Sequence, residues 1–371
     1  MIEPVGSKSN EPLVTLIAQQ LRRDVPGGIG TYIKQLVRAL VARADFEPGA
    51  LTLYASRSIA HDDPIVGLGA QLRTTPIPGS LLTRLWELGI GPRVAHGGIV
   101  HAPSLALPPT HLPLVVTIHD LAFQVVPETF TAHGRNWHER ALRRAARVCD
   151  AFVVPSDPIA AQLVGAGLGI ARDQVHVISE GSDHLGAPDQ EATRRLLEGL
   201  GVSHRFILSV GTIEPRKNVA RLIEAFDRVR DELVEPCSLV ICGPTGWMAD
   251  VKPTKGVVLA GHVPDSVLAG LYASAQVVAY VPLAEGFGLP VVEAMRYGAV
   301  VLSSAVPSAP RGSLVIDPYD VDAIAGGLIR CTQDDSLRQR LRADGLAYSE
   351  SLTWQRTAEA HLALWNEVAK R

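Results

Sequence analysis

The sequence of 371 residues is poor in cysteine and in aromatic residues, and it has no excess of charge of either sign. Aromatic residues make up 5%, which argues against a surface that stacks bases or sugar rings along a strip. Lysine and arginine number 35 and aspartate and glutamate 38, giving a net charge of −3. This balance excludes a protein that binds nucleic acid through its overall charge, although it allows a local basic patch.

Signal and membrane-spanning segments are lacking as well. The first ten residues are polar, without the apolar core of a signal peptide. Apolar stretches such as 112–118 are much shorter than a membrane span. The four cysteines are scattered, and Cys237 and Cys242 do not have a zinc-site spacing, so we interpret them as buried free thiols. These absences predict a cytoplasmic protein.

Short apolar runs alternate with helical patterns along the whole chain, and apolar residues make up 47% of it. The runs are 13–18, 51–54, 114–118, 151–154, 206–210, 239–242, 277–281 and 300–302. Apolar residues repeat at helical spacing in 33–41 and 222–229. This alternation is typical of α/β proteins with parallel sheets. There are more strands than one sheet normally holds, so we predict a first domain over 1–185 and a second over 186–351.

Glycines mark the first turn from strand to helix. Gly27, Gly28 and Gly30 let the backbone approach a ligand, and the N–H groups of the following helix N-terminus can bind an anion. The spacing does not match a dinucleotide fingerprint, because Ile33 stands where the third glycine is required. A structural turn and a phosphate or sugar contact fit this segment about equally well.

Two adjacent cations lie in the turn that opens the second domain. Arg216 and Lys217 follow Gly211, at the mouth of a turn where open α/β sheets bind ligands. Arginine can pair with two phosphate oxygens at once, and lysine adds a mobile charge. A solvated turn with a helix cap from Asn218 fits the spacing equally well.

The densest motif lies near the end of the second domain. Glu285 is in a loop, and Gly286 and Gly288 allow a tight turn with exposed amides. Pro290 suits the first turn of a helix, which puts Glu293 about one turn inside it. Two carboxylates around free N–H groups can hold a polyhydroxyl ligand beside an anionic group. Two capping glutamates, the alternative, leave the glycines and the proline unexplained.

With these motifs in this order, the sequence resembles the retaining nucleotide-sugar glycosyltransferases of family 4. The matching segments are 27–30, 119–120, 211–218, the E-x7-E pattern from Glu285 to Glu293, and 353–358. The resemblance covers essentially the whole chain. Within the family, the sequence is similar to the bacterial mannosyl- and rhamnosyltransferases that build surface polysaccharides and glycolipids. It implies the GT-B fold, with two facing Rossmann-like domains, parallel sheets, and a C-terminal helix in 352–371 that crosses back to the first domain.

The resemblance also implies roles for individual residues. In such enzymes an arginine and a lysine clamp the donor diphosphate, which points to Arg216 and Lys217. The first glutamate lies beside the donor sugar and the second holds the ribose, which points to Glu285 and Glu293. The other donor-binding residues that it implies are Gly27, Gly28, Gly211, His262, Val263, Gly286, Phe287, Gly288 and Leu289.

A histidine follows a buried strand of the first domain. His119 ends the apolar run 114–118, at an edge of the sheet where ligands bind. We predict that its imidazole donates to a sugar hydroxyl, with Asp120 orienting it on the acceptor side. A lone histidine is more often structural, but the place of His119 at the strand end and the family match favour a catalytic role. The predicted catalytic residues are thus His119, Arg216, Lys217 and Glu285.

The chemistry implied is transfer of a hexose with retention, without a metal or a cofactor. The leaving phosphate takes the proton of the acceptor hydroxyl, while the cations stabilise its charge. We expect GDP-mannose as the donor, with dTDP-rhamnose or a UDP-sugar next, and a glycan, glycolipid or small molecule as the acceptor. The sequence fixes neither the base, the acceptor nor the oligomeric state.

Several features leave alternatives open. The loop 303–312 is short and lacks the family's Pro-Glu pair, and Glu180 replaces its usual asparagine. A GT-B epimerase or hydrolase and a catalytically silent sugar-nucleotide-binding subunit are therefore the rival hypotheses. A nicotinamide dehydrogenase is disfavoured by the missing third glycine and by the lack of an acidic residue at the expected offset.

Two charged segments have a structural and a functional interpretation. Asp320 and Asp322 resemble the metal motif of another glycosyltransferase fold, but their place before a helical pattern favours a helix cap. The arginine-rich segment 135–147 is either a solvated helix face, the interpretation we favour, or a peripheral contact with the inner face of a membrane.

Overall fold

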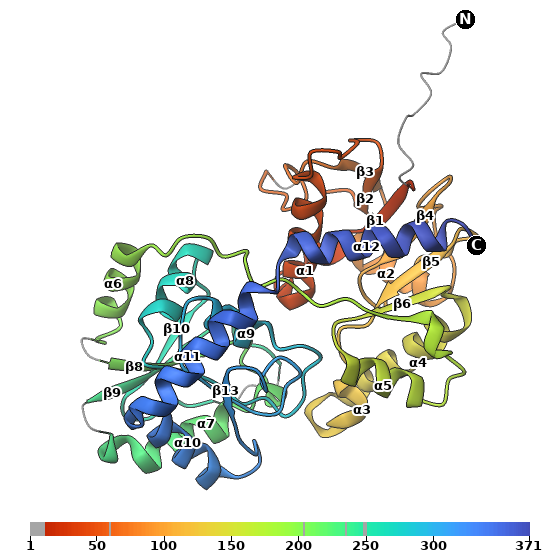
Figure 1. Cartoon of the computed structure of the whole chain (residues 1–371). Coiled ribbons are helices and arrows are strands. Elements are labelled where there is room, and N and C mark those ends of the chain that lie inside the picture. Colours follow the sequence, from red (N-terminus) through yellow and green to blue (C-terminus); the bar gives the residue numbers. More distant parts are fainter. Residues whose placement is uncertain (1–11, 59–60, 203–204, 234–235, 248–250) are drawn as a thin grey trace, which may run out of the picture.

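The chain forms two α/β domains side by side, each built on a parallel sheet (Figure 1). The structure is a computed structural model and describes residues 12–58, 61–202, 205–233, 236–247 and 251–371. In sheet order, the strands of the first domain are β3 (Gln71–Thr75), β2 (Leu51–Ser56), β1 (Val14–Ile17), β4 (Ile99–Ala102), β5 (Leu114–Thr117), β6 (Ala151–Val154) and β7 (Val175–Val177).

Helices cover both faces of this first sheet. They are α1 (Gly27–Val41), α2 (Gly79–Glu87), α3 (Ala122–Val125), α4 (Ala132–Val148) and α5 (Asp157–Gly165), with 3-10 turns η1 (Gln19–Arg22), η2 (Pro127–Thr129) and η3 (Arg172–Gln174). Leu36 of α1 packs against one face, and Trp86 of α2 and Leu142 of α4 pack against the other. Each central strand is therefore buried on both sides, as its apolar run requires.

The second sheet has the same parallel arrangement. In sheet order its strands are β10 (Val257–Gly261), β9 (Cys237–Cys242), β8 (Arg205–Val210), β11 (Val277–Tyr280), β12 (Val301–Ser303) and β13 (Ser313–Val315). The helical segments are α6 (Gln190–Gly199), η4 (Pro215–Lys217), α7 (Val219–Val229), η5 (Arg230–Glu232), α8 (Asp265–Ser274), α9 (Leu289–Arg296), α10 (Val321–Gln333) and α11 (Asp335–Glu350). Phe226 of α7 packs on one face and Met295 of α9 on the other.

The last helix returns to the first domain. Helix α12 (Trp354–Val368) lies along α1 of the first domain, whereas α11, which precedes it, packs on α9 of the second domain (Figure 1). Thr353 caps its N-terminus by accepting a hydrogen bond from the Arg356 N–H. Its apolar face, including Ala358 and Trp365, is buried in the core of the first domain. The predicted return helix is confirmed.

Most structural expectations from the sequence are confirmed. Each predicted apolar run coincides with a strand to within two residues. The four cysteines are buried and free. Asp320 caps α10 by accepting from the N–H groups of Asp322 and Ala323, as the capping interpretation required. The predicted boundary at 185 and 186 falls between β7 and α6, and its position there stays a prediction.

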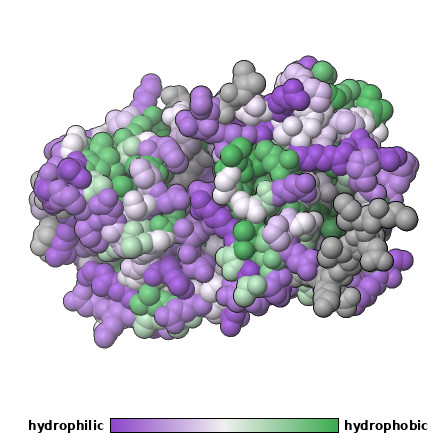
Figure 2. Space-filling view, turned by 90° about the horizontal axis from the view of Figure 1, so that it is seen from above, coloured by the Kyte–Doolittle hydropathy of each residue, from purple (hydrophilic) through white to green (hydrophobic). Residues whose placement is uncertain are grey.

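The outer surface is mixed. Seen from above, hydrophobic patches are scattered among larger hydrophilic areas on both halves of the molecule (Figure 2). Among the described residues, no helix is both long enough and apolar enough to cross a membrane.

Candidate active site

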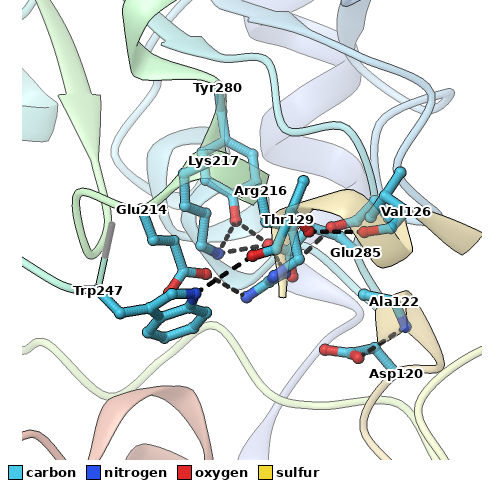
Figure 3. A network of polar contacts seen from close by, with 11 residues as sticks. Asp120, Ala122, Val126, Thr129, Glu214, Arg216, Lys217, Trp247, Tyr280 and Glu285 are labelled. Carbon is cyan, nitrogen blue, oxygen red and sulfur yellow. Dashed lines mark hydrogen bonds and ion pairs between the residues drawn. The ribbon is translucent and has the colours of Figure 1, made fainter. Parts of the chain in front are cut away.

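A cluster of two cations and two carboxylates lies where β8 and β11 end. Arg216 donates to Glu285 Oε1 over 2.6 Å and to Glu214 Oε1 over 2.8 Å. Lys217 also contacts Glu285, and it donates to the Tyr280 hydroxyl over 2.7 Å. Figure 3 shows these side chains pointing toward one another. The structure thus brings together three of the predicted catalytic residues, Arg216, Lys217 and Glu285.

Burial and charge act against each other in this cluster. Burial raises the pKa of Glu285, but Arg216 and Lys217 outweigh it and lower that pKa to about 2. Burial also raises the pKa of Glu214, and there the opposing cations do not outweigh it. For Arg216, burial lowers the pKa, whereas Glu285 and Asp120 raise it by a larger amount. Glu285 therefore stays ionised near neutral pH and balances the charge of the two cations.

Asn218 fixes the turn that carries the two cations. Its backbone is left-handed, with φ 60°, and its side chain is buried. The side-chain amide donates to the carbonyl of Val281 over 3.1 Å and to that of Pro318 over 2.7 Å. Asn218 occupies the N-cap position of α7, as the alternative interpretation supposed, but its side chain makes no capping hydrogen bond there. The residue joins the cation turn to the end of β11.

Asn218→Ala is expected to lower the free energy of unfolding by about 2–4 kcal/mol. It removes two buried hydrogen bonds, and alanine tolerates the left-handed backbone conformation of this position less well than asparagine does. Urea denaturation measures this loss. Asn218→Gly is the matched variant: it loses the same bonds but accepts the backbone angle, so its loss should be smaller. Equal losses of unfolding free energy in the two variants would contradict a contribution from the left-handed backbone angle.

The glycine-rich segment after Glu285 is held from two sides. Ser308 donates its N–H to the carbonyl of Phe287 over 3.1 Å and its hydroxyl to that of Gly288 over 3.1 Å. Gly288 has φ 97°, and a Cβ there would lie 2.8 Å from Val306. The short loop 303–312 thus packs directly on the predicted donor-binding segment. Leu289 begins α9, as predicted from Pro290.

The first domain contacts the same segment at Gly286. Ser156, which precedes α5, donates its hydroxyl to the carbonyl of Gly286 over 2.7 Å. A Cβ on Gly286 would lie 1.6 Å from the carbonyl oxygen of His119. Trp247 makes a further contact between domains by donating to the carbonyl of Thr129 over 3.2 Å (Figure 3). The two domains are therefore closed against each other at the site.

His119 lies after β5 and faces this contact, but its orientation differs from the prediction. Its Nδ1 lies 3.2 Å from Glu180 Oε1, and its Nε2 lies 3.1 Å from the carbonyl oxygen of Pro103. Asp120 instead accepts a hydrogen bond from the Ala122 N–H over 3.0 Å. Glu180, and not Asp120, is thus the carboxylate that orients His119.

Glu293 stands on the buried side of α9, apart from the cation cluster. Tyr272 donates its hydroxyl to Oε2 over 2.8 Å. The other oxygen, Oε1, lies 3.2 Å from Nε2 of His184, in the segment between the domains. Burial raises the pKa of the Tyr272 hydroxyl, and the neighbouring Glu293 raises it further.

The remaining predicted residues lie around these groups. Side chains added at Gly27 or Gly28 would meet no atom within 4 Å, so the start of α1 faces open space. Gly211 has φ 144° and lies beside the Lys217 side chain. His262 is exposed after β10, and Val263 is buried in the core. The described contacts do not join Gly27, Gly28 or His262 to the cation cluster.

Sequence reasoning missed several residues that contact the predicted site residues. They are Glu214, Tyr280, Glu180, His184, Tyr272 and Ser156. Tyr280 had a usable signal, since a tyrosine at the carboxyl end of a buried strand brings a hydroxyl to the ligand edge. Within the described ranges, no group of three or more histidine, cysteine or acidic residues is arranged to hold a metal.

Comparison with known proteins assigns this arrangement to a family. Residues 26–184 match the description "Glycosyltransferase Family 4", and residues 198–346 match "Glycosyl transferases group 1". O-antigen chain mannosyltransferase B of Escherichia coli is 30% identical over 88% of this chain and 93% of that protein. Phosphatidyl-myo-inositol mannosyltransferase of Mycobacterium tuberculosis is 29% identical over 93% of this chain and 94% of that protein.

A solved structure extends the likeness to the fold. Anabaena HepE in complex with UDP-glucose superimposes with a TM-score of 0.73 at 16% identity, over 95% of this chain and 98% of that one. A match over 95% of the chain includes both Rossmann-like domains, the architecture called GT-B. The chain belongs to glycosyltransferase family 4 and is a glycosyltransferase with the GT-B fold.

Proposed function

We propose that the protein transfers a mannosyl group from GDP-mannose to a hydroxyl of a glycan or glycolipid, with retention and without a metal or cofactor. The observation that carries the proposal is the pairing of Arg216 and Lys217 with Glu285 at the carboxyl edge of the second sheet. The mannosyltransferase relatives support the sugar, and the UDP-glucose bound by Anabaena HepE supports a nucleotide-sugar donor.

The cation pair suits a leaving diphosphate. As the bond from the sugar to the phosphate breaks, negative charge grows on the phosphate oxygens. Arg216 and Lys217 come from one turn, and their side chains are 13% and 15% exposed, so they would act in a region of low dielectric constant. Glu285 holds both cations in place before the donor arrives, so little reorganisation is needed when it binds.

Retention follows if the leaving phosphate itself removes the proton from the acceptor hydroxyl. The new bond then forms on the face from which the phosphate departs, and no side chain has to act as a base. His119 lies on the opposite domain, next to Gly286 of the donor segment. In this proposal Glu180 keeps its contact with Nδ1 of His119, while Nε2 exchanges the Pro103 carbonyl for a hydroxyl of the sugar.

The basic face of α4 fits the favoured interpretation of a solvated helix face, and contact with a lipid-linked acceptor or the inner membrane surface stays the alternative for it. Arg140, Arg143 and Arg147 are exposed on this helix, and Val148 beside them is exposed as well. Exposed arginines next to an apolar side chain are suited to an anionic lipid surface. A lipid-linked acceptor would then place the enzyme at that surface.

A thermal-shift panel of GDP-mannose, dTDP-rhamnose and UDP-glucose tests the donor. A ligand at 100 times its Kd stabilises the native state by about 2.7 kcal/mol, so the true donor should raise the Tm measurably. We expect the largest rise with GDP-mannose. A larger rise with another nucleotide sugar would replace GDP-mannose as the donor, and no rise with any of them would contradict the proposal.

A further inference from the structure

The chain crosses between the domains twice, and the two crossing segments are bonded to each other. Ser182 donates its N–H to the carbonyl of Leu352 over 3.0 Å, and Trp354 donates its N–H to Asp183 Oδ1 over 2.9 Å. A Cβ on Gly181 would lie 2.3 Å from the Trp354 nitrogen, so the two segments are in close contact. We call residues 181–184 and 352–354 the hinge.

One hinge side chain reaches into the second domain. The imidazole of His184 lies between the Trp354 indole, whose N–H points to Nδ1 over 3.3 Å, and Glu293, whose Oε1 is 3.2 Å from Nε2. The side chains of His184 and Glu293 are 4% and 9% exposed. An indole nitrogen only donates, so Nδ1 must accept, and the proton of the neutral ring must lie on Nε2. His184 therefore donates to Glu293.

The second carboxylate oxygen of Glu293 also accepts a hydrogen bond from the protein. Tyr272 donates to Oε2, so each oxygen of Glu293 is held by one donor from the protein. An ionised carboxylate has about four acceptor positions, which leaves capacity for two further donors. A ribose supplies two neighbouring hydroxyls of this kind. The carboxylate is thus oriented before a ligand arrives, and it can still accept from that ligand.

We infer that His184 is a positioning residue that orients Glu293 for the donor ribose and connects that recognition to the hinge between the domains. The inference rests on the proposed function, because it takes Glu293 as the carboxylate that binds the ribose of the proposed GDP-mannose donor. The connection is direct: Glu293 is on α9, His184 is in the outgoing hinge segment, and Trp354 begins the return helix. His184 is therefore in contact with Glu293 of the second domain and with both crossing segments of the hinge.

Two substitutions separate the two bonds of His184. The amide nitrogen of glutamine reaches the place of Nε2, so His184→Gln keeps the donor to Glu293 and loses the acceptor for Trp354. His184→Asn does the reverse, because its amide oxygen reaches the place of Nδ1. The imidazole borders a cavity of about 640 Å³, also lined by Asp183 and Trp354, so the site has space for either side chain.

Calorimetric titration with GDP measures the effect on nucleotide affinity. We expect His184→Asn to weaken binding about 10-fold, the loss typical of one hydrogen bond to a charged group, and His184→Gln to stay within about twofold of the wild type. The control is His111→Asn, at an exposed position of the first domain. Equal GDP affinities for His184→Asn and His184→Gln would overturn the inference. Thermal melts of both variants show whether either of them has lost its fold.

A double substitution tests whether His184 acts through Glu293. In a Glu293→Ala background, His184→Asn should weaken GDP binding no further, because its partner is already absent. Additive losses would overturn the inference. Suppose that the wild type binds GDP, that Glu293→Ala weakens this binding, and that His184→Asn leaves it unchanged. Then only the proposed role of His184 is wrong. If the wild type binds neither GDP, UDP nor dTDP, the proposed function fails, and this inference fails with it.

Discussion

Arg216→Ala is expected to lower the turnover of the sugar donor by about 100-fold or more, the usual cost of removing a group that stabilises charge in the transition state. Arg216 donates to two carboxylates and to the carbonyl of Ala284, so its guanidinium has one fixed position beside Lys217. Its loss removes a cation from the proposed diphosphate site. Steady-state release of nucleoside diphosphate measures the effect.

The control for this variant is another arginine of the same domain with two carboxylate partners. Arg228 pairs with Glu224 and Asp322 on the exposed side of α7, and Arg228→Ala should leave turnover unchanged. Arg216→Lys should fall between the wild type and the alanine variant, because it keeps the charge and loses the paired geometry. Near-normal turnover in Arg216→Ala would contradict the assignment of the diphosphate site.

Gly286→Ala is the second substitution with a large expected effect, and we expect a loss of turnover of about 100-fold with little loss of stability within each domain. The added Cβ would lie 1.6 Å from the carbonyl oxygen of His119, a backbone atom of the other domain. No left-handed backbone angle at Gly286 opposes an alanine, so the second domain can fold with it. What the methyl group prevents is the close contact between the domains.

Kinetics of donor turnover, together with thermal melts, separates these effects. The matched control is Gly326→Ala on α10, where an added Cβ would meet no atom within 4 Å, and it should retain full turnover. Normal turnover in Gly286→Ala would mean that reaction does not require this closed contact. A large fall in Tm would mean that the glycine serves folding, and the interpretation based on closure would then be wrong.

The central architecture was predictable because its strands are apolar and buried on both faces. The strands that sequence reasoning missed are mostly at or near sheet edges, where polar residues are tolerated: Gln71 and Arg73 belong to β3, and β7 and β13 are three residues long. β4 is the exception, since it lies at the centre of its sheet. Its four residues include the buried His101, which breaks the apolar pattern.

The site was predictable where each residue lies in a motif that can be recognised in the sequence by itself. Arg216, Lys217 and Glu285 lie in motifs with recognisable glycines and cations, and the fold brings them together. Glu180 and His184 lie in a linker that has no pattern of its own, and their partners are distant in sequence. Asp120 was expected beside His119 because it follows it, but the turn at Ala122 takes up its carboxylate.

The central claim is that this family 4 enzyme transfers a sugar from a nucleotide donor with retention. The most direct test is proton NMR of the reaction of the wild-type protein with GDP-α-mannose and a mannose-terminated glycan. Our account predicts release of GDP together with an α-linked mannosyl product. A β-linked product would contradict retention, and GDP-mannose that stays intact in the presence of the acceptor would contradict the proposed donor reaction.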